Sequence, residues 1–205
     1  MFKVNGWRVV LMVAALASFG PAMAHANLIV NGGFEAPDQG VGTGFTILGA
    51  IPGWTTSSGP GIEIQYGNVA GLPHSGDQLV ELDSTGNSGM FQSITTLPGD
   101  FYTLSFFYSP RPGISAASNG IEVWWNTSLL QTITGIGAGG TVWTEYSYTV
   151  LGGGPDTLKF VAVGTSDFLG GYIDDVELNA VPEPGTLLLI GSGLTGLALR
   201  RRRRQ

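Results

Sequence analysis

One tryptophan falls where the sequence pattern predicts a surface, and there it could stack on the C–H face of a sugar ring. In the segment 121–126, IEVWWN, the odd positions are apolar. Side chains of a strand alternate between two faces, so this pattern places Trp124 outward beside Glu122. Trp54 and Tyr66, which lie near expected loops, are further candidates. We therefore predict ligand contacts at these four residues, although an isolated surface aromatic residue is also ordinary.

Residues that could perform catalysis are few. The chain has no cysteine, which excludes disulfides, a thiol nucleophile and Cys-ligated zinc. His74 is the only histidine between residues 27 and 180, and the turn-like segment LPHSG around it predicts a solvated side chain. No H-E-x-x-H, G-x-S-x-G or P-loop pattern occurs. A glycosidase needs two carboxylates about 5 to 10 Å apart. Among fourteen acidic residues some pair meets this requirement by chance, so the number of acids is uninformative. We expect no catalytic residues.

Charge is strongly segregated along the 205 residues, whose formal net charge is -6. Residues 27–180 hold fourteen acidic and two basic side chains, Arg111 and Lys159, a balance of -12. Two basic side chains cannot neutralise a run of phosphates. We therefore expect no nucleic-acid partner.

The elements that must position these side chains are short strands. Apolar runs in residues 27–180 are separated by glycine, proline, serine and asparagine, and none keeps a helical period. About twelve short strands with frequent turns predict an all-β, two-sheet antiparallel sandwich. The expected strands are 28–30, 45–48, 54–56, 62–66, 78–83, 90–94, 102–108, 121–126, 129–134, 143–150, 157–163 and 172–178.

The first 26 residues have the anatomy of a secretory signal peptide. Lys3 and Arg8 precede the apolar stretch 9–19, and Ala24-His25-Ala26 is a small-residue cleavage pattern. A transmembrane helix is the alternative, but eleven apolar residues are too few to cross a bilayer. We predict a signal helix that is cleaved after Ala26.

The C-terminal segment 181–205 predicts a short transmembrane helix. Pro182 and Pro184 interrupt the chain, residues 185–199 are uncharged, and five arginines follow. Fifteen residues rise about 22 Å as a helix, and snorkelling arginines can compensate part of the shortfall against the bilayer core. The arginines place this end in the cytoplasm, so the preceding domain must be exported. A permanent tail anchor is the alternative to a transient one.

This segment resembles a known sorting signal. Pro182, Glu183 and Pro184, followed by an apolar helix and an arginine cluster, are similar to the PEP-CTERM signal of Gram-negative bacteria that make extracellular polysaccharide. The resemblance implies processing near this motif by an integral-membrane exosortase. It also implies that the protein then goes to the cell surface or the extracellular matrix.

The domain itself, residues 27–180, resembles the galactose-binding-like jelly roll of many carbohydrate-binding modules. The resemblance rests on NLIVNGGFE (27–35), SGDQLVELDS (75–84), WTEYSYTV (143–150) and GYIDDVEL (171–178). It implies a structural calcium ion between the first and last strands, held by Glu35 and by Asp174 or, after a register shift, Asp175. The alternative is that the two aspartates cap a turn or are solvated.

These observations predict an exported, non-enzymatic β-sandwich that associates with extracellular polysaccharide. Two alternatives stay open because a fold does not fix function. One is a purely structural matrix protein that binds no sugar, and the other is a secreted carbohydrate-active hydrolase.

Overall fold

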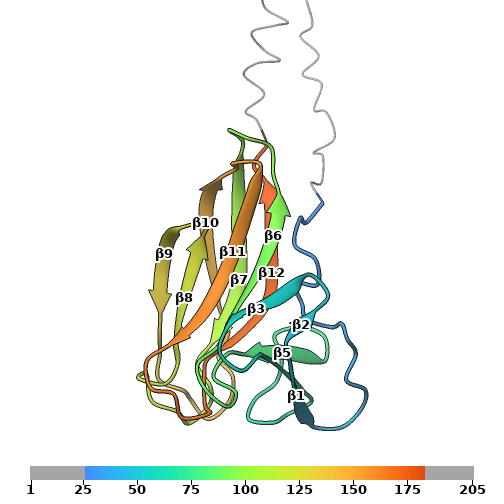
Figure 1. Ribbon diagram of the computed structural model, residues 1–205. Helices are drawn as coiled ribbons and strands as arrows, with labels where there is room; N and C mark the ends of the chain where they lie inside the picture. The colour runs from blue at the N-terminus through green and yellow to red at the C-terminus, as the bar shows by residue number, and fades with distance from the viewer. Residues whose placement is uncertain (1–25, 183–205) are drawn as a thin grey trace, which may run out of the picture.

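The structure, a computed structural model, describes residues 26–182, which form twelve strands and no helix (Figure 1). The predicted signal helix and the predicted C-terminal transmembrane helix lie outside these residues. Of the residues described, none belongs to a helix that is long and apolar enough to span a membrane.

The strands form two six-stranded sheets in which all pairs are antiparallel. The first sheet has the order β1 (Gly44–Leu48), β4 (Ile62–Tyr66), β5 (Gln78–Glu81), β12 (Tyr172–Ala180), β7 (Phe101–Ser109) and β10 (Thr144–Leu151). The second has the order β2 (Ala50–Ile51), β3 (Trp54–Ser58), β6 (Gly89–Thr95), β11 (Pro155–Val163), β8 (Gly120–Trp125) and β9 (Ser128–Ile133).

The predicted fold class is confirmed, and eleven of the twelve predicted strands correspond to observed ones. The exception is 28–30, which is not assigned as a strand, although the Leu28 amide donates to the Leu178 carbonyl of β12 at 2.9 Å. The first and last segments of the domain are therefore adjacent, as expected. The sequence pattern missed β2, because two residues carry no periodicity.

Alternating side chains explain how the two sheets pack together. In β7 the even residues Tyr102, Leu104, Phe106 and Tyr108 are buried between the sheets, whereas the odd residues face away. In β8 the odd residues 121, 123 and 125 are buried, as predicted. Inward aromatic and branched side chains thus fill one continuous core, the arrangement that favours a sandwich.

The link between β8 and β9 is a two-residue turn, Asn126 and Thr127. Asn126 has φ 55°, a left-handed conformation that asparagine tolerates. Its side-chain amide donates to Asp156 at 2.7 Å, and its amide oxygen accepts from the Thr157 N–H at 2.8 Å. These bonds fix the hairpin to the start of β11.

Candidate functional site

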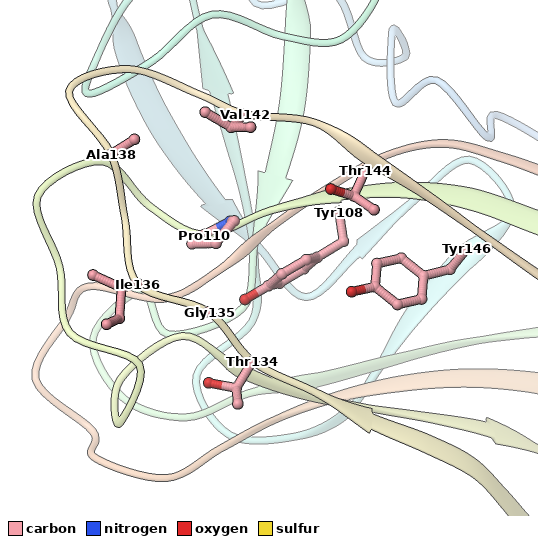
Figure 2. A pocket seen from close by; sticks show the side chains of 9 residues that line it. All are labelled: Tyr108, Pro110, Thr134, Gly135, Ile136, Ala138, Val142, Thr144 and Tyr146. Atoms are coloured by element: carbon pink, nitrogen blue, oxygen red, sulfur yellow. The ribbon is translucent and has the colours of Figure 1, made fainter.

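A pocket of about 290 Å³ opens beside the edge strand β10, at the end of the sandwich away from the two ends of the described chain (Figures 1 and 2). We call it the tyrosine pocket. It lies between the ends of β7 and β9 and the loop 134–143 that precedes β10. Its lining residues are Tyr108, Pro110, Thr134, Gly135, Ile136, Ala138, Val142, Thr144 and Tyr146.

Two aromatic rings form a corner of this pocket. The rings of Tyr108 and Tyr146 lie 6.1 Å apart at 80° to each other, and Figure 2 shows both hydroxyl groups on the side of Thr134 and Gly135. Tyr108 is 2% exposed and forms the floor, while Tyr146 is half-buried and forms a wall. The Tyr108 hydroxyl donates to the Asn119 carbonyl at 2.7 Å, which fixes the floor in place.

The loop that closes the pocket is held by backbone contacts with the β7–β8 loop. Gly137 donates to the Ile114 carbonyl at 2.8 Å, and Gly113 donates to the Ala138 carbonyl at 2.9 Å. A Cβ atom at Gly137 would collide with the Arg111 carbonyl, so this close approach requires glycine. The pocket is therefore pre-formed.

Its lining is uncharged and mixes apolar surface with hydroxyl groups. None of its lining side chains is an acid or a base. Burial, with a smaller contribution from Tyr146, raises the pKa of the Tyr108 phenol, so this hydroxyl stays protonated. Such a lining suits a neutral ligand that has both apolar faces and hydroxyl groups.

Sequence analysis did not find this pocket. Tyr108 and Tyr146 point inward by strand alternation, which is ordinarily a sign of core positions. Tyr146 remains accessible only because β10 is an edge strand, and the sheet order is not visible in the sequence. The signal that could have indicated it is the repeated tyrosine in the segment TEYSYTV.

The predicted ligand contacts Trp124 and Glu122 face outward from the second sheet. The Trp124 indole N–H donates to Glu122 Oε2 at 3.0 Å. The Lys159 ammonium lies 4.8 Å from the centre of the Trp124 ring. Lys159 thus occupies space over this ring, which competes with a sugar for the same surface.

The predicted ligand contact at Trp54 is wrong. Its side chain is 0% exposed and packs between Phe34 and Phe160, at ring distances of 5.7 and 6.0 Å. Its indole N–H donates to the Asn31 carbonyl at 3.2 Å. A strand that starts beside a loop can still turn its first side chain into the core, and Trp54 does so. Tyr66 is half-buried at the end of β4 and does not line the tyrosine pocket.

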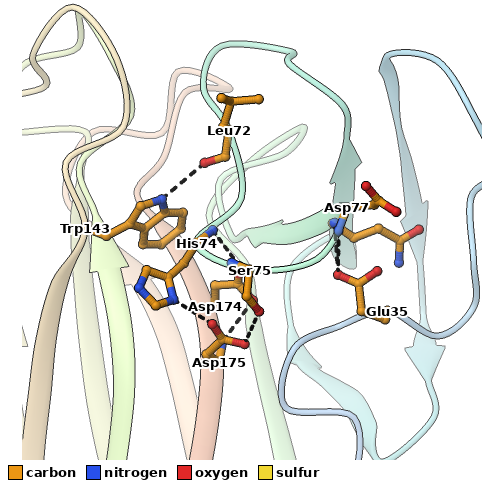
Figure 3. Close-up of polar contacts among 9 residues, drawn as sticks. Glu35, Leu72, His74, Ser75, Asp77, Trp143, Asp174 and Asp175 are labelled. Atoms are coloured by element: carbon orange, nitrogen blue, oxygen red, sulfur yellow. Dashed lines mark hydrogen bonds and ion pairs between the residues drawn. The ribbon is translucent and has the colours of Figure 1, made fainter.

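The predicted metal ligands Asp174 and Asp175 lie at a bulge of β12 (Figure 3). Asp174 Oδ2 accepts the backbone N–H groups of His74 and Ser75 at 2.9 and 3.3 Å. Asp175 has φ 47° and accepts the Ser75 hydroxyl at 2.7 Å. Burial, and then the charge of Asp175, raise the pKa of Asp174 to about 8.

Glu35 anchors the other side of the same loop. Its Oε1 accepts the backbone N–H groups of Asp77 and Gln78 at 3.0 and 3.1 Å. A Cβ atom at Gly76 would collide with this oxygen, so the loop passes very close to the carboxylate.

Carboxylate oxygens are suitable calcium ligands. However, the carboxylates of Glu35, Asp174 and Asp175 point toward N–H and O–H groups, whose hydrogens repel a cation. Over residues 26–182, no three His, Cys, Asp or Glu side chains are grouped so as to hold a metal ion. A calcium ion here stays a prediction.

His74 is exposed, as predicted, but its ring also makes specific contacts. Its ring stacks on Phe107 of β7 at 3.5 Å, and its Nδ1 lies 2.6 Å from Asp175 Oδ2. Trp143 meets the ring edge-on at 5.9 Å and donates its indole N–H to the Leu72 carbonyl at 3.1 Å. The loop 67–77 is thus held against the outer face of the first sheet.

One buried carboxylate pair bears on the hydrolase alternative. Glu63 and Glu81 both accept the side-chain amide of Gln65, and Glu81 also pairs with Arg111. Burial raises the pKa of Glu81 to about 8, although Arg111 opposes this shift. The two glutamates are 4% and 0% exposed, so a polysaccharide cannot reach them. This pair does not support glycoside hydrolysis.

Comparison with known proteins gives similarities over most of the domain. The chain is 31% identical over 173 residues to a multifunctional-autoprocessing repeats-in-toxin protein of Vibrio vulnificus. That match covers 78% of this chain but only 3% of the toxin's length. A toxin of the same description from Vibrio cholerae is 28% identical over 173 residues, again 78% of this chain and 3% of the toxin.

Among solved structures, an adhesin domain supports the fold. The K1 cleaved adhesin domain of Lys-gingipain from Porphyromonas gingivalis W83 matches with a TM-score of 0.50 and 18% identity, covering 69% of this chain and all of that domain. The TmCBM61 structure in complex with β-1,4-galactotriose matches with a TM-score of 0.48 and 17% identity, covering 76% of this chain and 99% of the other.

The C-terminal end matches a family model described as the PEP-CTERM protein-sorting motif, over residues 180–203. This range contains Pro182, Glu183 and Pro184, the residues on which the resemblance was based, and all but the first three of its residues lie beyond those the structure describes. The chain therefore carries a PEP-CTERM motif on the C-terminal side of an all-β sandwich. This motif belongs to exported proteins that are processed by an exosortase and sorted to the cell surface.

Proposed function

We propose that this chain is a non-enzymatic, exported domain that associates with extracellular polysaccharide by binding a neutral sugar unit in the tyrosine pocket. The observation that carries the proposal is the pre-formed, uncharged corner made by Tyr108 and Tyr146. The C–H faces of a sugar ring can pack on a tyrosine ring, while hydroxyl groups around it bond to the sugar's own.

The size of the pocket restricts what can enter. Its volume of about 290 Å³ lies at the lower end of the range for small-molecule sites, so it suits one or two sugar units. Exposed Ile136 and Val142 at its rim leave the rest of a polymer free to continue into solvent. A uronic acid would bring a carboxylate to a lining that has no cation, and its desolvation would be uncompensated.

The charge of the domain favours the same ligand class. Fourteen acidic residues against two basic ones repel acidic polymers at low ionic strength. Arg111 is already paired with Glu81, and Lys159 lies on Trp124. Neutral polysaccharide carries no such repulsion.

Polysaccharide pull-down with the full chain tests the proposal. We expect retention on neutral polymers, such as galactans, glucans or mannans, and little on alginate or polygalacturonate. Trp124→Ala should retain binding, because this residue lies on the opposite sheet. Retention by none of the neutral polymers would favour the structural matrix protein instead, and hydrolysis of any of them would favour the hydrolase.

The calcium ion predicted at Glu35, Asp174 and Asp175 is a separate proposal. A cation that binds only the folded state must raise the melting temperature of the protein. We expect chelation to lower the melting temperature of the full chain, and Glu35→Gln to reduce that difference. Equal melting curves with and without chelator would remove calcium from this site.

A further inference from the structure

An exposed apolar patch lies at the end of the sandwich where the described chain begins and ends (Figure 1). Four large side chains form it, and each is between 42% and 65% exposed. We call Leu97, Phe101, Leu151 and Val181 the terminal patch. They come from the β6–β7 turn, the start of β7, the end of β10 and the residue after β12.

Backbone contacts make these four positions neighbours. Phe101 and Leu151 are cross-strand partners in β7 and β10, so their side chains share the outer face of the first sheet. The Val181 N–H donates to the Phe101 carbonyl at 2.8 Å. The Gly99 N–H donates to the Gly152 carbonyl at 2.9 Å, which joins the turn of Leu97 to the turn after Leu151. Single exposed apolar residues are normal, but a contiguous group of them marks a surface that contacts another apolar body.

The apolar surface continues from the terminal patch to the two ends of the domain. Leu97 lines a second pocket of about 310 Å³ together with Leu28 and Ala180. No charged side chain lines this pocket. The surface beside the departing chain is therefore apolar over a wider area than the four exposed side chains.

Charge does not explain what this surface contacts. Of the two basic residues between positions 27 and 180, Arg111 is paired with Glu81 and Lys159 lies on Trp124. Asp100, in the same turn as Leu97, is half-buried and acidic. An anionic partner would therefore find no free cation here, so the occupant must be recognised through apolar contact.

The next part of the chain indicates which apolar body lies there. Val181 is followed by three residues and then by the uncharged segment 185–199, the predicted transmembrane helix. The four steps from Val181 to Gly185 span at most about 14 Å, even fully extended. Fifteen helical residues rise about 22 Å, less than the roughly 30 Å of hydrocarbon they must cross. A segment that is too short draws its flanking residues toward the bilayer, so the terminal patch reaches the lipid headgroups.

We propose that the terminal patch rests on the lipid bilayer that the segment 185–199 enters. This contact lies at the opposite end of the domain from the tyrosine pocket and does not depend on sugar binding. Its apolar side chains enter the interface between headgroups and acyl chains, as those of surface-bound amphipathic elements do to a depth of about 5–10 Å. The tail and the patch together hold the domain upright, with the tyrosine pocket directed away from the bilayer.

Depth measurement in vesicles tests this contact. The chain has no cysteine, so a single introduced cysteine can carry a pyrene label at one defined position. The full chain is reconstituted in phosphatidylcholine vesicles whose acyl chains carry a nitroxide quencher. We expect strong quenching of pyrene at Leu97→Cys and little at Ile136→Cys, an exposed position at the tyrosine-pocket end.

Two exposed leucines on edge strands supply a matched pair of variants. Leu151→Glu places a charge in the terminal patch on β10, whereas Leu129→Glu places the same charge on β9, in the second sheet. With pyrene at Leu97→Cys, we expect Leu151→Glu to remove most of the quenching, because a carboxylate is costly to take out of water. Leu129→Glu should leave the quenching unchanged. Equal melting temperatures of the two variants show that both are folded.

Equal quenching at positions 97 and 136 would overturn the proposal, and so would quenching that Leu151→Glu leaves intact. Pyrene excimer emission without quenching would overturn it too, since a second copy of the chain would then cover the patch. A chain that does not bind vesicles would contradict both the predicted transmembrane helix and this contact. Retention on neutral polysaccharide tests the tyrosine pocket separately and should be unchanged in Leu151→Glu.

Discussion

Trp54 and Trp124 are both strand tryptophans, yet only Trp124 reaches the surface. Alternation within 121–126 was enough to orient Trp124, because the residues two positions away on its own face, Glu122 and Asn126, are polar. Trp54 is followed by TTSS, which has no alternation, so the sequence could not show which face it takes. Its burial depends on Phe34 and Phe160, which come from distant parts of the chain.

The titration of one residue, Glu81, makes the folding stability of the protein depend on pH. Its pKa rises from 4.5 to about 8 on folding, so the folded state keeps a proton that the unfolded state has lost. That stabilisation is complete below pH 4.5 and is lost as the pH rises to 8. Asp174, with a pKa of about 8, acts in the same direction.

We therefore expect the melting temperature to fall between pH 5 and pH 8. Glu81→Gln should reduce this pH dependence, since an amide does not titrate. Between pH 5 and pH 8 the wild type should lose roughly 2–4 kcal/mol more unfolding free energy than the variant. Urea denaturation at both pH values measures it. A wild-type stability that rises toward pH 8 would contradict the assignment.

At the scale of elements, the loop 67–77 is positioned by its contacts with strands. Glu35, the β12 bulge and Phe107 each hold one part of it. His74→Ala removes the ring stack and the contact with Asp175, and should cost about 1–2 kcal/mol.

Hydrogen exchange should locate this loss in the loop. We expect faster exchange at the amides of residues 74–78 in His74→Ala and no change in β8 and β9. Asp77→Ala, in the same loop but exposed, is the control. Uniformly faster exchange across both sheets would mean that His74 supports the whole domain instead.

Most strands could be predicted from the sequence, but their order in the sheets could not. Ile62–Tyr66, for example, is predicted with both of its bounds, because alternation and flanking glycines define it. The tyrosine pocket depends on β10 being an edge strand and on the packing of loop 134–143, which are long-range properties. The contacts of His74 could not be predicted for the same reason, since Phe107 and Asp175 are remote in sequence.

At the scale of the whole molecule, the ends of the described chain and the tyrosine pocket lie at opposite ends of the sandwich (Figure 1). Ala26, Leu28 and Ala180 line one shared pocket, so both ends of the domain emerge together. A C-terminal tether therefore leaves the tyrosine pocket directed away from it. This layout suits a domain that is held at a surface and binds polymer beyond it.

The mass of the protein recovered from its host reports on both export signals. We expect a mass that lacks residues 1–26 and ends near Pro182, Glu183 and Pro184, as signal cleavage and exosortase processing require. An intact C-terminal arginine cluster in the surface-associated protein would instead indicate a permanent anchor.

The most direct test of sugar binding compares two tyrosines of the same strand. Tyr146 and Tyr148 are both half-buried and both stack on Phe106, but only Tyr146 lines the pocket. The measurement is the affinity of the full chain for the neutral polysaccharide that retains it best in the pull-down. Tyr146→Ala and Tyr148→Ala are compared under conditions in which both variants are fully folded. We predict a loss of at least about tenfold for Tyr146→Ala, equal to roughly 1.4 kcal/mol, and little change for Tyr148→Ala. Equal affinities of the two variants would contradict binding in the tyrosine pocket.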